Sequence, residues 1–154
     1  MRWAFTVHFM EQGCQAAGGL HDQTAGASTS TLITTDILVV EDTLPNLELI
    51  RTILERAGYR VHTARSGEEM RAVLASVEPD LILMDIGLPD ADGLDLTQEL
   101  KAEQGTTSIP VVVLTASATP TEETRAWAAG CNGFMRKPFS ASSLLAEIHA
   151  LLQR

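Results

Sequence analysis

Residues 81–85 read Leu81-Ile82-Leu83-Met84-Asp85, four apolar side chains in a row that end at an acid. An apolar run without polar alternation is typical of a strand that is buried on both faces of a parallel sheet. Similar short runs recur along the chain from residue 37 onward, and those that begin at residues 60 and 133 are the weakest. The five predicted strands are Ile37–Val40, Arg60–Thr63, Leu81–Met84, Val111–Leu114 and Gly133–Met135.

Amphipathic stretches with helix signals separate these strands. Leu47, Ile50 and Leu54 fall at helical spacing and Gly58 follows as a stop, so the first helix is predicted from about Pro45 to Ala57. Further helix starts are indicated by three capping residues. These are Ser66 with Glu69, Thr119 with Pro120 and Glu122, and Ser140. The alternation of strand and helix predicts the α/β class, a parallel sheet with helices on both faces.

Length and composition favour a single globular domain. The chain has 154 residues, of which 45% are hydrophobic and 20% charged, enough for one core but hardly for two. Residues 1–36 lack any helical or strand period, so we interpret them as a flexible N-terminal tail before a domain at residues 37–154. A signal peptide and a start codon assigned too early are alternatives for this segment. His8 and Glu11 interrupt the apolar stretch that a signal peptide needs.

The charge and cysteine content argue against several classes of partner. The formal net charge of −9 repels phosphate backbones, so we expect no direct nucleic-acid binding. The run Val111–Leu114 falls far short of the ~20 apolar residues that span a bilayer, so we expect no membrane insertion. Cys14 and Cys131 lie far apart in the sequence without metal-ligand spacing, which fits a reducing cytoplasm better than a disulfide or zinc site.

Polar residues stand at the ends of four predicted strands. Glu41 and Asp42 follow the first, Asp85 the third, Thr115 the fourth, and Lys137 comes shortly after the fifth. Ligands of open parallel α/β sheets bind outside the carboxyl ends of the strands, so these side chains should share one edge. Three converging carboxylates repel one another unless a cation neutralises them. Their hard oxygen atoms suit Mg²⁺ better than zinc.

Such a site is suited to receive a phosphoryl group. Lys137 adds a fixed positive charge and Thr115 a hydroxyl donor, and catalysis of phosphoryl transfer is mostly positioning and charge stabilisation. Asp85 would be the nucleophile.

Five sequence pieces carry a family resemblance. They occur in one order and at consistent spacings, which makes coincidence remote although each piece alone is weak. The pieces are Val39-Val40-Glu41-Asp42, the stretch from Leu81 to Pro89 around Asp85, Asp92-Gly93, Val113-Leu114-Thr115-Ala116 and Lys137-Pro138. Over residues 37–154 the chain resembles the receiver domains of two-component response regulators. The resemblance implies a doubly wound five-stranded parallel sheet of order 2-1-3-4-5, the flavodoxin-like (βα)5 fold.

The resemblance also implies roles for the site residues. Asp42, Asp85 and the backbone carbonyl of Gly87 would bind Mg²⁺, with Glu41 contributing through water. Asp85 would accept the phosphoryl group, and Lys137 would pair with the phosphorylated aspartate.

Two further positions would form the switch. Thr115 would hydrogen-bond a phosphoryl oxygen, and Phe134 matches an aromatic position that turns inward on activation. The alternative for Phe134 is that it only packs in the core. A cis bond before Pro138 is common in the family. Gly87 and Ser117 occupy positions that tune how long the phosphoryl group lasts, and Glu41 stands where Asp is more frequent.

The expected partners are a histidine kinase or a histidine phosphotransfer protein, together with a downstream protein target. The fifth helix reaches the end of the chain, so we expect output through partners, as in free-standing regulators of the DivK type. A phosphorelay intermediate and a detached receiver of a hybrid kinase are the alternatives. A haloacid-dehalogenase-like phosphatase is disfavoured because Gly87 replaces its second acid, and a flavodoxin because Glu41 and Asp42 would repel the phosphate of its ligand.

Overall fold

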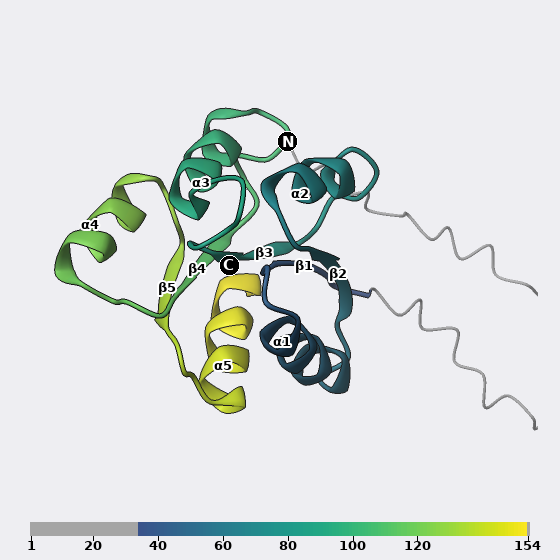
Figure 1. Ribbon diagram of the computed structural model, residues 1–154. Coiled ribbons are helices and arrows are strands. Elements are labelled where there is room, and N and C mark those ends of the chain that lie inside the picture. The colour runs from purple at the N-terminus through teal and green to yellow at the C-terminus, as the bar shows by residue number, and fades with distance from the viewer. Residues whose placement is uncertain (1–33, 154) are drawn as a thin grey trace, which may run out of the picture. The chain divides into compact units, whose positions relative to one another are not determined.

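The computed structural model describes residues 34–153, in which five strands and five helices alternate along the chain (Figure 1). The strands are β1 Asp36–Val40, β2 Arg60–Ala64, β3 Leu81–Asp85, β4 Val111–Thr115 and β5 Gly133–Arg136. The helices are α1 Leu44–Arg56, α2 Gly67–Leu74, α3 Gly93–Ala102, α4 Pro120–Ala128 and α5 Ala141–Leu152. The predicted alternation is confirmed, and each strand differs from its predicted bounds by one residue at one end.

All strand pairs are parallel, and the strand order is β2-β1-β3-β4-β5. This is the predicted doubly wound order. The direction in which successive strands are added to the sheet reverses between β1 and β3, and the carboxyl ends of these two strands lie side by side at the point where such sheets bind ligands. In Figure 1, α1 and α5 lie on one side of the sheet, and α2 and α3 lie on the other.

Alternating side chains of the central strands supply a separate core on each face. Leu38, Ile82 and Val113 point into the core that includes α2, α3 and α4. Ile37, Leu83 and Val112 point into the core under α1 and α5. Because both faces are buried, the strands need apolar residues at every position, which explains the unbroken runs in the sequence.

Local signals fix the helix ends as predicted. The Ser66, Thr119 and Ser140 hydroxyl oxygens accept hydrogen bonds from backbone N–H groups in the first turns of α2, α4 and α5. Gly58 ends α1 with a φ of 94°, a left-handed conformation that glycine adopts without steric cost.

The predicted tail at residues 1–36 lies mostly outside the described residues, as does Cys14, although Asp36 already belongs to β1. Cys131 is buried, and burial raises the pKa of its thiol to about 11, so it is an unreactive packing residue. Among residues 34–153, no helix is long and apolar enough to cross a membrane.

Candidate functional site

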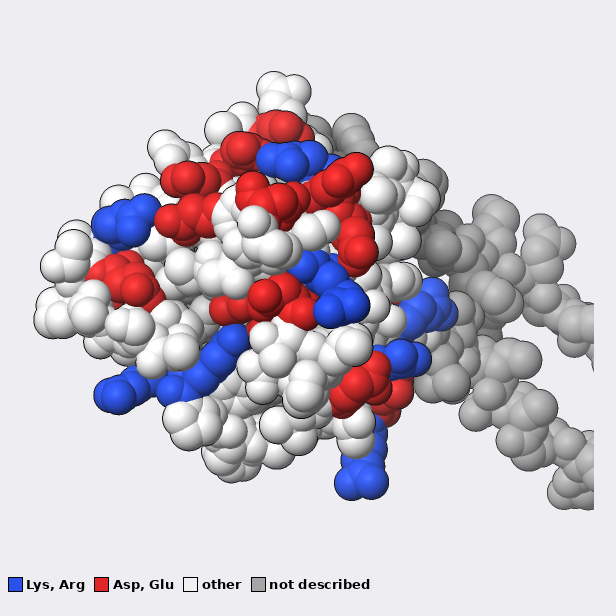
Figure 2. Space-filling model, in the orientation of Figure 1, with Lys and Arg blue, Asp and Glu red and all other residues white. Residues whose placement is uncertain are grey.

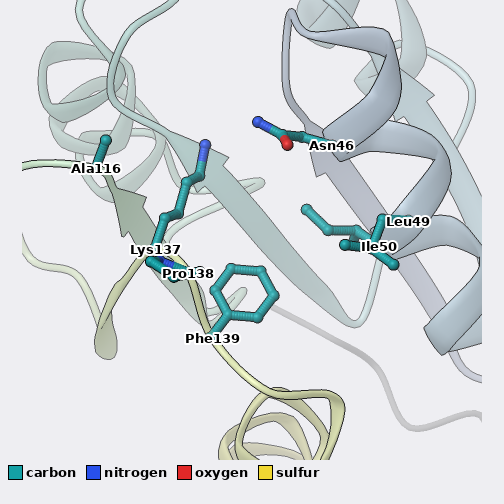
Figure 3. Close-up of a pocket in the computed structure, with 7 residues that line it drawn as sticks. All are labelled: Asn46, Leu49, Ile50, Ala116, Lys137, Pro138 and Phe139. Atoms are coloured by element: carbon teal, nitrogen blue, oxygen red, sulfur yellow. The ribbon is translucent and has the colours of Figure 1, made fainter.

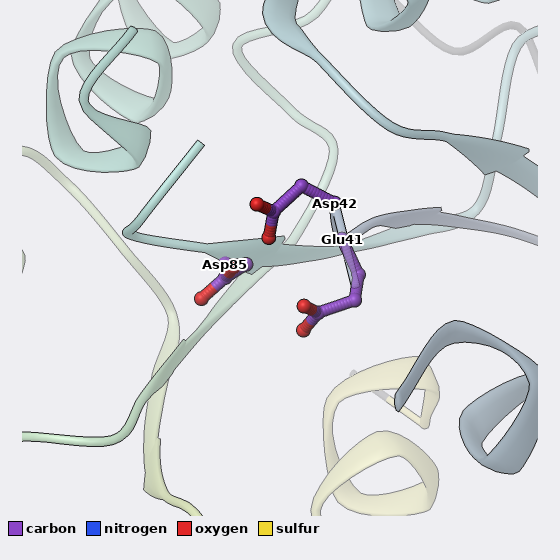
Figure 4. Close-up of side chains that lie close together, drawn as sticks. All are labelled: Glu41, Asp42 and Asp85. Atoms are coloured by element: carbon purple, nitrogen blue, oxygen red, sulfur yellow. The ribbon is translucent and has the colours of Figure 1, made fainter. Parts of the chain in front are cut away.

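The carboxyl ends of β1 and β3 bring three acids together (Figure 4). Glu41 and Asp42 directly follow β1, and Asp85 is the last residue of β3. One carboxylate oxygen from each lies within 4.8 Å of the others. Glu41 is only 1% exposed and Asp85 7%, so two of the three charges are withdrawn from water.

Lys137 pairs with two of these acids. Its Nζ donates to Glu41 Oε2 at 2.6 Å and to Asp85 Oδ1 at 3.1 Å. Burial disfavours the ammonium, but the bonds to Glu41 and the charge of Asp85 outweigh it and raise the pKa of Lys137. Lys137 therefore carries a stable positive charge inside the site at neutral pH.

The donor set of this cluster fits a hard divalent cation. In the described part of the chain, Lys137 is the one cationic side chain paired with this cluster, so three carboxylates are offset by one positive charge and Asp42 has no ion-pair partner. Arg65 is exposed and donates to the backbone carbonyl of Asp42 rather than to a carboxylate. Clustered oxygen ligands without thiolate or imidazole favour Mg²⁺ among the biological cations.

The loop after β3 holds its shape through close backbone contacts. The N–H of Gly93 donates to the carbonyl of Ile86 at 2.9 Å, and Gly87 pairs with Asp92 in a single antiparallel bridge. A Cβ atom on Gly93 would lie 2.1 Å from the carbonyl oxygen of Asp85, so no side chain fits there. By contrast, a Cβ atom on Gly87 would meet nothing within 4 Å.

Thr115 lies at the end of β4, the strand that pairs with β3, and is 3% exposed. Its hydroxyl donates to Glu122 Oε1 on α4 and accepts from the backbone N–H of Ser117 at 3.0 Å. Thr115 therefore lies at the end of the strand next to the one that carries Asp85, and its hydroxyl is engaged by α4. The sequence identified Glu122 as a residue of the α4 cap and did not reveal this contact.

The last two predicted positions lie on or after β5. Phe134 is half-buried and packs against the core under α2, α3 and α4. The bond between Lys137 and Pro138 is cis, as predicted. Phe134 lies on the predicted fifth strand, and its switching role stays a prediction.

A pocket of about 320 Å³ opens beside the Lys137 side chain (Figure 3). Its wall on one side is the first half of α1, and its other wall is the segment after β5. The lining residues are Asn46, Leu49, Ile50, Ala116, Lys137, Pro138 and Phe139. Leu49 is 58% exposed although it is large and apolar, which makes the rim of this pocket a candidate contact surface.

Acidic side chains crowd the face shown in Figure 2, both at its centre and over the part that carries α2 and α3. Exposed members on these elements include Glu68, Glu69, Asp95 and Glu99. Arg71 of α2 bonds Glu99 of α3 at 2.8 Å, so part of this charge is paired. The field at this face favours cations.

Comparison with known families gives one clear match. The family model described as response regulator receiver domain matches residues 37–149. The chain is 37% identical over 120 residues to the polar-differentiation response regulator DivK of Brucella ovis, covering 78% of this chain and 98% of that protein. It is 36% identical over 118 residues, 77% of this chain, to the phosphate regulon transcriptional regulatory protein PhoB of Pseudomonas aeruginosa, but it spans only 52% of PhoB's length.

Solved structures agree with this match. A response regulator described as putative, from Chloroflexus aurantiacus, superimposes with a TM-score of 0.76 at 30% identity, covering 79% of this chain and 99% of the other. The receiver domain of a sensor histidine kinase from Pseudomonas aeruginosa PAO1 gives a TM-score of 0.73 at 30% identity, with coverage of 79% and 99%. That second structure holds a magnesium ion coordinated in its active site cleft.

Proposed function

Because this chain belongs to the family of response regulator receiver domains, we propose that Asp85 is its phosphoryl-accepting residue and that Glu41, Asp42 and Asp85 hold Mg²⁺ with the backbone carbonyl of Gly87. One observation carries the proposal: the ammonium of Lys137 bridges Glu41 and Asp85, while Asp42 lies within 4.8 Å of both acids. This geometry combines a nucleophilic carboxylate with an anchored cation.

In the proposed reaction, a carboxylate oxygen of Asp85 attacks the phosphorus atom of a phosphohistidine. A P–O bond forms as the P–N bond breaks, and the leaving imidazole of the donor takes up a proton. Bound Mg²⁺ would neutralise charge on the phosphoryl oxygens. Lys137 is already within hydrogen-bond distance of Asp85 and can hold the product, which adds roughly −1.5 to −2 charge.

The protein is accordingly a phosphorylation switch and not an enzyme that turns over a separate substrate. Thr115 and Phe134 lie on neighbouring strands in the sheet, and we assign them the response to the new charge. The hydroxyl of Thr115 would turn to a phosphoryl oxygen, and Phe134 would repack toward the space that it leaves. Surface contacts of α4 and β5 would change as a result.

Labelling with acetyl phosphate tests the assignment of Asp85. In the presence of Mg²⁺ the protein should take up one acid-labile phosphate, and Asp85→Asn should abolish this uptake because the amide is a poor nucleophile. The control is Asp95→Asn, which alters an exposed carboxylate on α3. Labelling of Asp85→Asn at the level of the control would move the phosphorylation site elsewhere.

The donor is proposed to be a histidine kinase or histidine phosphotransfer protein that docks across α1. Its phosphohistidine must approach Asp85, and the pocket beside Lys137 opens between α1 and the segment after β5. Leu44 and Leu49, 49% and 58% exposed, supply apolar area on the α1 side. A helical surface with apolar side chains is complementary to this rim.

Output is proposed to pass through a downstream protein in the cytoplasm, as for free-standing regulators. The 98% coverage of DivK favours this role. A phosphorelay intermediate or the receiver of a hybrid kinase is the second candidate, favoured by the similarity to a kinase receiver. Rapid return of phosphate from Asp85 to a histidine phosphotransfer protein would support the second role.

A further inference from the structure

The hydroxyl of Thr115 has two partners in this structure. It accepts one hydrogen bond from the N–H of Ser117 and donates its single proton to the Glu122 carboxylate. A hydroxyl has one proton to donate, so a donor bond to Glu122 excludes a simultaneous donor bond to a phosphoryl oxygen. The Glu122 carboxylate and a phosphoryl oxygen would therefore compete for the proton of the Thr115 hydroxyl.

Glu122 is placed for this contact by an altered helix cap. In a complete capping box, the Glu side chain at the third helical position reaches back to the backbone N–H of the N-cap residue. Here Thr119 does accept from the N–H of Glu122 at 3.2 Å, but the N–H of Thr119 donates to the carbonyl of Ser117. The Glu122 carboxylate turns to Thr115 instead, so it holds the switch hydroxyl and α4 together.

Helix α4 has few other attachments to the domain. Of its nine residues, Pro120–Ala128, only Ala126 is buried, whereas α3 buries five residues. Within residues 34–153, the side-chain hydrogen bonds and ion pairs that join α4 to other elements are the bond from Thr115 to Glu122 and an exposed ion pair of 3.3 Å between Arg125 and Asp92. A helix with so little buried area responds to the loss of one hydrogen bond more readily than a well-buried helix.

We propose that Glu122 is a positioning residue that competes with the phosphoryl group for the Thr115 hydroxyl and so holds the receiver in its unphosphorylated form. This inference rests on the proposed function of Asp85 and Thr115. Phosphorylation must break the contact to Glu122, which releases the first turn of α4. By linkage, removal of Glu122 favours the phosphorylated form by the same amount that the contact disfavours it.

Calorimetric titration of the full chain with beryllofluoride, a phosphoryl mimic, measures this competition in the presence of Mg²⁺. Glu122→Ala should bind beryllofluoride about three- to tenfold more tightly than the wild type, the range that corresponds to one net hydrogen bond. Alanine keeps the backbone N–H that Thr119 caps, so the start of α4 survives the substitution.

Two controls separate the hydrogen bond from a general charge effect. Glu123→Ala removes an exposed carboxylate next along α4 that has no hydrogen bond or ion pair among residues 34–153, and its affinity should stay within about twofold of wild type. In a Thr115→Ala background, Glu122→Ala should no longer tighten binding, because the contested hydroxyl is gone. Equal gains with and without Thr115, or no gain in either background, would overturn the proposal.

Hydrogen exchange gives a second measurement that does not depend on ligand affinity. Backbone amides of residues 121–129 should exchange faster in Glu122→Ala without ligand and in the wild type with beryllofluoride, but not in Glu123→Ala. Unchanged exchange in Glu122→Ala would mean that the contact does not hold α4. If Asp85→Asn binds beryllofluoride as the wild type does, the proposed function fails. If Asp85→Asn loses beryllofluoride binding but Glu122→Ala behaves like the wild type, the proposed function stands and the role of Glu122 alone is refuted.

Discussion

At the start of α3, the backbone of Gly93 lies against the carbonyl group of Asp85, and this approach leaves no room for a side chain. Gly93→Ala would place a Cβ atom 2.1 Å from that oxygen, so β3 and the loop after it must move. We expect the free energy of unfolding to fall by about 2 to 3 kcal/mol, as for other overpacked sites. Urea denaturation measures the change.

Gly87→Ala is the matched control in the same loop, because its Cβ atom would meet nothing within 4 Å. Its unfolding free energy should change by less than about 1 kcal/mol. Equal losses for the two variants would show that the loop tolerates no alanine at all, and that the contact between Gly93 and Asp85 is not the cause.

Lys137 is both a partner of the acids and a competitor of Mg²⁺. Removing its ammonium leaves Glu41 and Asp85 without an ion-pair partner, so a divalent cation is attracted more strongly. Lys137→Met should therefore bind Mg²⁺ several-fold more tightly, because even in a water-like medium two unit charges at 4 Å interact by about 1 kcal/mol. Calorimetry with Mg²⁺ alone measures this affinity.

Arg136→Met removes the same charge from the neighbouring exposed position and should leave the Mg²⁺ affinity within about twofold of wild type. Weaker Mg²⁺ binding by Lys137→Met would mean that the lysine organises the carboxylates for the ion and does not compete with it.

Between elements, the Asp90 carboxylate ties the loop after β3 to the start of α2. It accepts hydrogen bonds from the N–H of Gly67 at 2.8 Å and of Glu68 at 3.1 Å, and these bonds lower its pKa. A carboxyl group with a lowered pKa stabilises the fold above its unfolded pKa of 3.8, and this stabilisation is lost as pH falls through its folded pKa.

Asp90→Ala should therefore melt at a lower temperature than the wild type at pH 7, and the difference should shrink below pH 3.8, where wild-type Asp90 also becomes protonated. Thermal melts monitored by circular dichroism at pH 7 and below pH 3.8 test this prediction. Asp95→Ala, at an exposed position on α3, should show a smaller difference. A difference in melting temperature between Asp90→Ala and wild type that is the same at all pH values would show that the substitution acts through packing and not through the charge of Asp90.

The central elements were predictable from sequence because their environment is uniform. Every residue of β3 and β4 is buried, so continuous apolar runs marked both strands within one residue. Edge strands carry weaker signals, since β2 buries only Ala64 and β5 only Gly133. The start of β1 was placed one residue late, because Asp36 is polar and its N–H bonds the carboxylate of Asp80, 44 residues away.

The position of the acid cluster could be predicted from the order of the strands, whereas the hydrogen bonds of the residues around it could not. Parallel strands bring Glu41 and Asp85 to one edge whatever the details of the loops. The contact between Thr115 and Glu122 depends on the path of the chain from residue 116 to residue 119, which no periodicity in the sequence encodes. A capping signal at Glu122 was visible, but not which partner its carboxylate would choose.

On the scale of the whole molecule, residues 34–153 contain both cores of the sheet. We therefore predict that a chain lacking residues 1–33 folds and keeps its melting temperature within a few degrees of the full chain, because every strand and capped helix is retained. Differential scanning calorimetry compares the two proteins. A fall of more than about 10 °C, equivalent to roughly 2.5 kcal/mol at about 2.1 cal/mol/K per residue in a domain of this size, would show that the first residues stabilise the fold.

Recognition of the phosphodonor involves the molecule as a whole, because it needs the surface of α1 together with the acid cluster. Leu49 is large, apolar and 58% exposed at the rim of the pocket beside Lys137. Leu49→Ala should slow phosphate transfer from the cognate phosphohistidine protein by about five- to thirtyfold, as truncation of a central apolar contact does. Uptake from acetyl phosphate, which needs no docking surface, should be unchanged.

Trp127→Ala provides the comparison, since Trp127 is 49% exposed on α4, a helix on the other side of the sheet from α1. A donor that docks on α1 should transfer phosphate to Trp127→Ala at the wild-type rate, whereas a target that reads the phosphorylated form through α4 should bind this variant less tightly. The two substitutions thus separate input from output. Transfer kinetics slowed equally by both would mean that the donor covers α4 as well, and the assignment of α1 as the donor surface would fail.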